Sequence, residues 1–128
     1  MADRPWMSMS ATVLDSADAQ ELAGFYERLL GWTRGADEPG WVTLRPPGGG
    51  TGLSFAGEPD TYVRPTWPSD GDHQQMMSHL DIEVRDLAEG VAHALACGAT
   101  LADFQPQDLV RVLLDPAGHP FCLWVQPS

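Results

Sequence analysis

The residues best suited to chemistry in this sequence stand close together on one predicted strand. Residues 79–84 read His-Leu-Asp-Ile-Glu-Val, so His79, Asp81 and Glu83 share one face while apolar residues occupy the other. A carboxylate beside a histidine raises the pKa of the imidazole and orients the ring, which is the arrangement of a general base. A hydrogen-bonded histidine without a catalytic role is the alternative interpretation, and both stay open here.

The two cysteines, Cys97 and Cys122, match no disulfide framework and no metal-binding motif. Cys97 falls at the end of a predicted helix and Cys122 in a predicted strand, so both are expected to be small buried apolar side chains.

An internal repeat must position these residues. Residues 11–55 align with residues 79–123, with the same order of helix caps, apolar alternation and turns. The equivalent pairs include Asp18 and Asp86, Val42 and Val110, Leu44 and Val112, and Gly50 and Gly118. Two copies of one supersecondary unit are therefore expected, with the functional site where the copies meet.

The first copy is predicted to run strand, helix, strand, strand, with an additional edge strand near residues 32–34. The second copy is predicted to run strand, helix and three strands. The helices begin at Asp18 and Asp86, which can accept backbone N–H groups of the first turn, and end at Gly31 and Gly98. The strands are expected at 9–16, 41–45, 52–56, 79–84, 99–104, 109–114 and 120–126. These elements predict an α+β fold.

One domain is expected over residues 1–128, with a first repeat at about 8–56, a linker at 57–75 and a second repeat at about 76–126. The linker is rich in proline and contains Tyr62 and Trp67. Long connections in compact domains are often functional, so these aromatic residues either form a lid over the site or pin a plain linker to the surface.

Strand alternation predicts which side chains cover the helices and which line the opposite, concave face. The predicted lining of that face is Ala11, Val13, Trp41, Thr43, Arg45, Ser54, His79, Asp81, Glu83, Arg111, Leu113, Cys122 and Trp124. Two tryptophans among a few polar groups suit a pocket for a small molecule. The ligand-binding residues expected from this set are Trp41, Thr43, Arg45, Ser54, His79, Asp81, Arg111, Cys122 and Trp124.

Several sequence motifs resemble those of the vicinal oxygen chelate superfamily, which includes glyoxalase I, extradiol dioxygenases and bleomycin-resistance proteins. The motifs are Asp18…Phe25-Tyr26…Leu30-Gly31-Trp32, the strand at 79–84, and Asp115-Pro-Ala-Gly-His-Pro-Phe121. The resemblance covers nearly the whole chain and is closest to glyoxalase-like domains. It implies two tandem βαβββ repeats whose curved mixed sheets form a cup, often in a homodimer.

The resemblance also implies where a metal would be held, on the first and last strand of each repeat. The matching positions here are Ala11, Ser54, His79 and Cys122. Alanine has no donor atom and a neutral serine hydroxyl is a poor ligand, which leaves His79 and Cys122 as a pair that would hold a soft ion weakly. A catalytic zinc site needs three protein ligands, so no metal and no other cofactor is expected.

Charge and hydropathy restrict the classes of partner. The formal net charge is -11, which repels nucleic acid and anionic membranes and attracts cationic small molecules. No apolar run approaches the length of a membrane span, and the N-terminal residues lack a signal-peptide core, so a cytoplasmic protein is expected.

Three functions remain open from the sequence. The first is metal-independent binding of a small aromatic or cationic molecule in the cup, as in bleomycin-resistance proteins. The second is a lyase or dioxygenase of the glyoxalase type that uses a divalent metal ion. The third is metal-free acid–base catalysis by His79 with Asp81 or Glu83.

Overall fold

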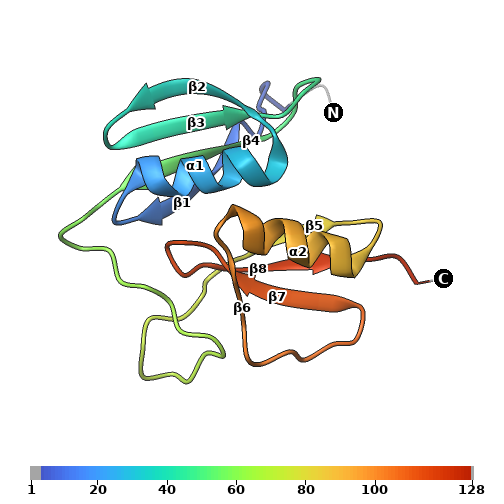
Figure 1. Cartoon of the computed structure of the whole chain (residues 1–128). Helices are drawn as coiled ribbons and strands as arrows, with labels where there is room; N and C mark the ends of the chain where they lie inside the picture. Colours follow the sequence, from blue (N-terminus) through green and yellow to red (C-terminus); the bar gives the residue numbers. More distant parts are fainter. Residues whose placement is uncertain (1–3, 128) are drawn as a thin grey trace.

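The computed structural model describes residues 4–127 and consists of two βαβββ repeats (Figure 1). The first contains β1 (Ala11–Ser16), α1 (Ala19–Leu30), β2 (Thr33–Glu38), β3 (Trp41–Arg45) and β4 (Gly52–Gly57). The second contains β5 (Leu80–Glu83), α2 (Leu87–Cys97), β6 (Thr100–Leu101), β7 (Val110–Leu114) and β8 (Pro120–Trp124). The predicted α+β fold with tandem repeats is confirmed. Residues 1–3 and 128 of the expected domain lie outside the described residues.

Each repeat folds into a four-stranded mixed sheet with the same topology. The strand orders are β1-β4-β3-β2 and β5-β8-β7-β6. The first strand of each repeat lies parallel to the last, and the remaining pairs are antiparallel. Because the pattern is identical, equivalent strands occupy equivalent places in the two sheets.

Side-chain caps start both helices, as the sequence predicts. The Asp18 carboxylate accepts hydrogen bonds from the backbone N–H groups of Gln20 and Glu21, and Asp86 accepts one from Glu89. Helix α1 ends at Gly31, whose φ of 72° is the left-handed conformation that glycine tolerates best. These local signals explain why the helices were predictable.

The repeats meet through their helices. Helices α1 and α2 contact each other and lie side by side in the middle of the molecule (Figure 1). Among residues 4–127 no strand of one sheet pairs with a strand of the other. The Nη2 atom of Arg28 in α1 donates a hydrogen bond to the Cys97 carbonyl at the end of α2, at a distance of 2.9 Å.

An aromatic cluster joins the two repeats into one core. Phe25 and Tyr26 of α1 and Phe55 of β4 are all fully buried, and so is Phe121 of β8. The Tyr26 ring stacks on Phe55 at 5.6 Å between centroids and meets Phe121 at 6.2 Å. The core is therefore continuous across the boundary between the repeats.

A buried carboxylate ties the β7–β8 turn to α1. Asp115 is 1% exposed, and its Oδ2 accepts a hydrogen bond from the Tyr26 hydroxyl at 2.8 Å. Its Oδ1 accepts from the backbone N–H groups of Ala117 and His119. Burial raises the pKa of Asp115, whereas His119 and these hydrogen bonds act in the opposite direction.

The linker is attached to the second repeat by its aromatic residues. The Tyr62 hydroxyl donates to the Ala117 carbonyl at 2.7 Å, and Trp67 Nε1 donates to the Phe104 carbonyl at 3.2 Å. These contacts favour the interpretation of a pinned linker over that of a lid. No helix in the described part of the chain is long and apolar enough to cross a membrane.

Candidate functional site

The open face of the first sheet carries one group of the predicted site residues. Thr43 of β3 is directly opposite Ser54 of β4, and Trp41 and Arg45 follow at alternating positions on β3. With Ala11 of β1 they line a shallow cavity of about 920 Å³. Period-two alternation explains this grouping, because every second side chain of a strand points to the same face.

The open face of the second sheet carries another group. His79, Asp81, Cys122 and Trp124 line a cavity of about 290 Å³. Asp81 of β5 is directly opposite Cys122 of β8, and His79 stands immediately before β5. The predicted residues are thus brought together in two groups on two sheets.

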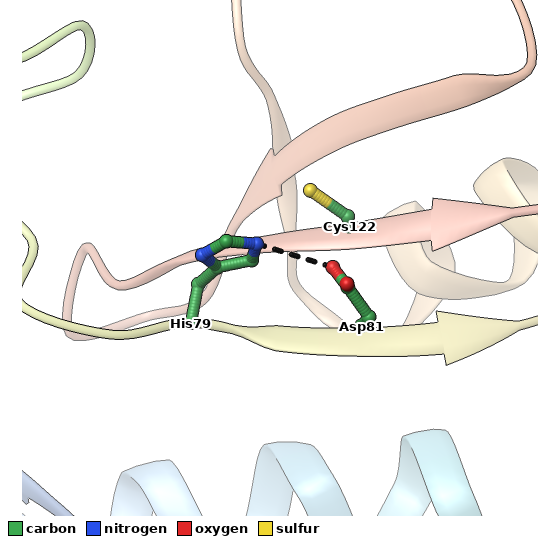
Figure 2. A group of neighbouring side chains, drawn as sticks. All are labelled: His79, Asp81 and Cys122. Atoms are coloured by element: carbon green, nitrogen blue, oxygen red, sulfur yellow. Dashed lines mark ion pairs between the residues drawn. The ribbon is translucent and has the colours of Figure 1, made fainter.

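Three side chains of the second face point toward one another (Figure 2). His79 Nε2 lies 3.1 Å from Asp81 Oδ1, and one ligand atom each of His79, Asp81 and Cys122 lie within 4.8 Å of one another. The His79 and Asp81 side chains are 37% and 62% exposed. The group is therefore open to solvent and to a ligand.

Cys122 differs from the sequence expectation of a small buried core residue. Its side chain is only half-buried and lies beside Asp81 on the open face. Burial and then the neighbouring Asp81 raise the pKa of the Cys122 thiol to about 11, so the thiol is protonated at neutral pH. Cys97 is buried, as expected, and neither cysteine forms a disulfide.

The four positions that the resemblance assigns to a metal do not form a ligand set. Ala11 has no donor atom, and Ser54 offers only a neutral hydroxyl on a residue that is 3% exposed. Asp81, which the sequence predicts to be a partner of the imidazole, supplies a third donor beside His79 and Cys122. The period-two spacing of His79 and Asp81 was the available signal, but only the β5–β8 register places Cys122 opposite Asp81.

The prediction that Arg111 lines the open face is wrong. Arg111 is directly opposite Leu123, a core residue that is 1% exposed, and opposed residues of antiparallel strands share a face. Arg111 Nη1 donates instead to the backbone carbonyls of Asp108 and Val110, at 3.0 and 2.9 Å. The guanidinium therefore stabilises the loop before β7.

The same error affects the neighbouring positions of β7. Leu113, which was expected on the open face, is fully buried in the core, and Val112 is the residue opposite Cys122. The sequence alignment of Val42 with Val110 therefore places β7 one residue away from its structural equivalence with β3, in which Val112 corresponds to Thr43. A shift of one residue moves every side chain of a strand to the opposite face. Because β7 has apolar residues at both odd and even positions, its sequence does not indicate which set faces the core.

The two groups of predicted site residues do not lie where the copies meet. The copies meet through α1, α2 and the aromatic cluster, which lie on the helix-covered faces of the sheets. Strands pair only within their own sheet among the described residues, so each open face has its own cavity.

Two βαβββ repeats with open sheet faces define the class of protein to which the vicinal oxygen chelate enzymes and their binding relatives belong. A family model described as a glyoxalase-like domain matches residues 11–124. The chain belongs to the glyoxalase-like domain family, as its motifs predict. No curated protein matches the chain.

Solved structures from several bacteria share the fold. A glyoxalase/bleomycin resistance protein/dioxygenase family enzyme from Burkholderia phytofirmans PsJN has a TM-score of 0.70 at 17% identity, covering 93% of this chain and 98% of its own. TnmS3, an antibiotic-binding protein from Streptomyces sp. CB03234, has a TM-score of 0.61 at 18% identity, covering 98% and 99%. A glyoxalase-related enzyme from Fulvimarina pelagi has a TM-score of 0.66 at 20% identity, covering 95% and 90%. Identities this low establish the fold alone.

Proposed function

We propose that the open sheet faces bind a small aromatic or cationic molecule without a metal ion. The observation that carries the proposal is the cavity of about 920 Å³ on the first sheet, where Trp41 lies beside Thr43, Arg45 and Ser54. Its volume is that of a drug-sized ligand site. The metal-ligand positions of this repeat are Ala11 and Ser54, which cannot complete a metal centre.

Charge and aromatic content favour this class of ligand. The first face, with Trp41 and Arg45 in its cavity, suits an aromatic ligand. The second face, with Asp81, Glu83 and Trp124, suits a cationic one, and the net charge of -11 attracts cations. Tryptophan faces bind both aromatic rings and cations. A structural relative, TnmS3, is an antibiotic-binding protein, which supports binding as a use of this fold.

A homodimer is part of the proposal. Arg45 lines the cavity of the first face and Asp81 lines that of the second, so unlike faces of two copies attract each other. Exposed apolar side chains border the first face, including Met9, which is 73% exposed. Light scattering should give twice the chain mass of 13.9 kDa, and a mass of 13.9 kDa contradicts the dimer.

Tryptophan fluorescence tests ligand binding directly. Titration with a panel of cationic glycopeptides and aromatic metabolites should produce saturable quenching with at least one compound. Trp41→Ala or Trp124→Ala should weaken binding of that compound at least about tenfold, because tryptophans that a ligand covers contribute much of the binding energy.

Trp6→Ala is the matched control, because Trp6 is 89% exposed and lines neither cavity. Its affinity should equal that of the unmodified protein. The absence of a spectral change across the whole panel contradicts the proposal, as does equal weakening by all three substitutions.

A second candidate function is divalent-metal chemistry, favoured by the cluster of His79, Asp81 and Cys122. Nitrogen, oxygen and sulfur donors in one group suit a borderline ion such as Zn²⁺. When bound there, such an ion acts as a Lewis acid toward an oxygen atom of a substrate. His79 with Asp81 would alternatively support acid–base catalysis without a metal, which His79→Ala should then abolish.

Alkylation of Cys122 distinguishes the metal-dependent candidate from the metal-free proposal. The rate with iodoacetamide, followed by peptide mass spectrometry, should be low at neutral pH and rise to half-maximum near pH 11. Asp81→Asn should move this midpoint to lower pH, because Asp81 helps to raise the pKa of the thiol. The metal-free proposal predicts the same rates with and without Zn²⁺.

Protection by Zn²⁺ that is lost in His79→Ala would instead support the metal-dependent candidate. Metal analysis of the purified protein provides the second measurement. Near-stoichiometric Zn²⁺ that a chelator removes, together with that protection, would overturn the metal-free proposal.

A further inference from the structure

A separate cavity of about 350 Å³ lies between the end of β1, the linker and the segment that precedes β5. The lining includes Val13 and Asp15 of β1, Glu58 and Tyr62 of the linker, Met77 before β5, and His119 of the β7–β8 turn. None of the residues that line this cavity lines the cavities on the two open faces. It is therefore an independent site candidate.

Hydrogen bonds between distant segments hold the walls of this cavity in place. His119 Nε2 donates to the Asp15 carbonyl at 2.6 Å, because a carbonyl oxygen can only accept. The Tyr62 hydroxyl donates to the Ala117 carbonyl at 2.7 Å, and the Tyr62 and His119 rings lie 5.9 Å apart. The cavity is thus preformed, which lowers the entropic cost of binding.

The charge of the cavity is negative. Asp15 and Glu58 contribute carboxylates, and within residues 4–127 neither carboxylate forms an ion pair or accepts a side-chain or backbone hydrogen bond. No arginine is among the described residues that line the cavity. Arg64 lies nearby, but its Nη1 donates to the Pro116 carbonyl at 2.7 Å. The two carboxylates therefore lack a protein cation.

Apolar side chains surround these carboxylates. The large apolar side chains of Val13, Val63 and Met77 line the cavity and remain 50%, 59% and 82% exposed. Their apolar surface is therefore available to a ligand. Methionine adapts its shape to different ligands, and the Tyr62 ring provides an aromatic wall. The combination of unpaired carboxylates and apolar walls matches a positively charged molecule with an apolar body.

We propose that this cavity is a second ligand site, which binds a small organic ammonium ion with its cationic group toward Asp15 and Glu58 and its apolar part toward Val13 and Met77. A volume of about 350 Å³ is at the lower end for ligand pockets, so the ligand is small. The site goes beyond the proposed function, because it shares no lining residue with the cavities on the open faces.

The test uses 2-phenylethylammonium as probe and 2-phenylethanol as its neutral counterpart of similar size. Both are titrated into the full chain, and backbone and indole N–H signals are followed by NMR. The ammonium ion should cause saturable shifts at Val13, Ser78 and His119, and bind at least about tenfold more tightly than the alcohol.

Charge-neutral variants identify the source of this preference. The double variant Asp15→Asn/Glu58→Gln should lose about tenfold in affinity for the ammonium ion. The control Asp60→Asn/Asp103→Asn has the same net charge, but its substitutions lie outside the cavity, so it should bind like the unmodified protein.

Three results would overturn the proposal. They are equal affinity for amine and alcohol, equal loss in the two double variants, and shifts confined to the Trp41 and Trp124 indoles. The last result would support the proposed function while rejecting this site. Shifts at the cavity without any at the indoles would support this site alone.

Discussion

Replacing Asp115 by alanine is expected to lower the free energy of unfolding by about 2–4 kcal/mol, since hydrogen bonds to a charged group contribute more than neutral ones and the orphaned donors add a cost. Three donors would lose their partner: the Tyr26 hydroxyl and the N–H groups of Ala117 and His119. The Tyr26 hydroxyl is buried, so water cannot replace the carboxylate there. Urea denaturation followed by circular dichroism measures the loss.

Asp115→Asn separates shape from charge and has a predictable pH dependence. The folded-state pKa of Asp115 is raised, so the protonated form favours the folded state. The proton-linked part of this stability is therefore full below the unfolded pKa of about 3.9 and is lost as the pH rises through the raised folded value, whereas the hydrogen bonds that the carboxylate accepts remain. The asparagine variant should gain stability relative to the unmodified protein across that window.

Asp103→Ala is the matched control, because Asp103 is exposed and outside the turn. It should change the free energy of unfolding by no more than about 0.5 kcal/mol. A loss in Asp115→Ala equal to that of Asp103→Ala would contradict the role of Asp115 as a tie between the repeats.

Replacing Phe121 by alanine should destabilise the protein by about 3–5 kcal/mol, the cost of deleting a buried aromatic ring and leaving a cavity. Phe121 is fully buried and contacts Phe25 at 5.9 Å and Tyr26 at 6.2 Å between ring centroids. Both partners belong to the other repeat. We therefore expect the loss to appear as a lower midpoint of one cooperative unfolding transition.

Phe104→Ala provides the comparison for the same chemical change at a surface position. Phe104 is 49% exposed, and its ring centroid lies 6.0 Å from that of Trp67 in the linker. Its substitution should cost about 1 kcal/mol or less. Equal midpoints for the two variants, or two separate transitions in the unmodified protein, would contradict a core shared by both repeats.

Most of the fold could be predicted because its signals are local. Capping by Asp18 and Asp86 and the stop at Gly31 depend on hydrogen bonds within a few residues. Alternation in β3, β4 and β8 depends on the pleat of a single strand. Strand β6 was the weaker case, since only Thr100–Leu101 pairs with β7 where a strand over 99–104 was expected.

The candidate site was predictable only in strands whose apolar and polar residues alternate strictly. Trp41, Thr43 and Arg45 alternate with buried Val42 and Leu44, so their common face follows from the sequence. Strand β7 is apolar at both phases, and its pairing with β8 alone decides that Arg111 faces the core side. A local pattern contains no information about such a register.

The repeat, most of its helices and strands, and the contrast of His79 and Cys122 with the equivalent Ala11 and Ser54 follow from local sequence patterns. The position of Cys122 directly opposite Asp81, within reach of His79, follows only from the register of two strands that are far apart in the chain. The tertiary structure also decided that the repeats join through their helices and leave the sheet faces open. Packing between distant segments is set by the complementarity of whole surfaces, whereas periodicity is set by the backbone of each segment.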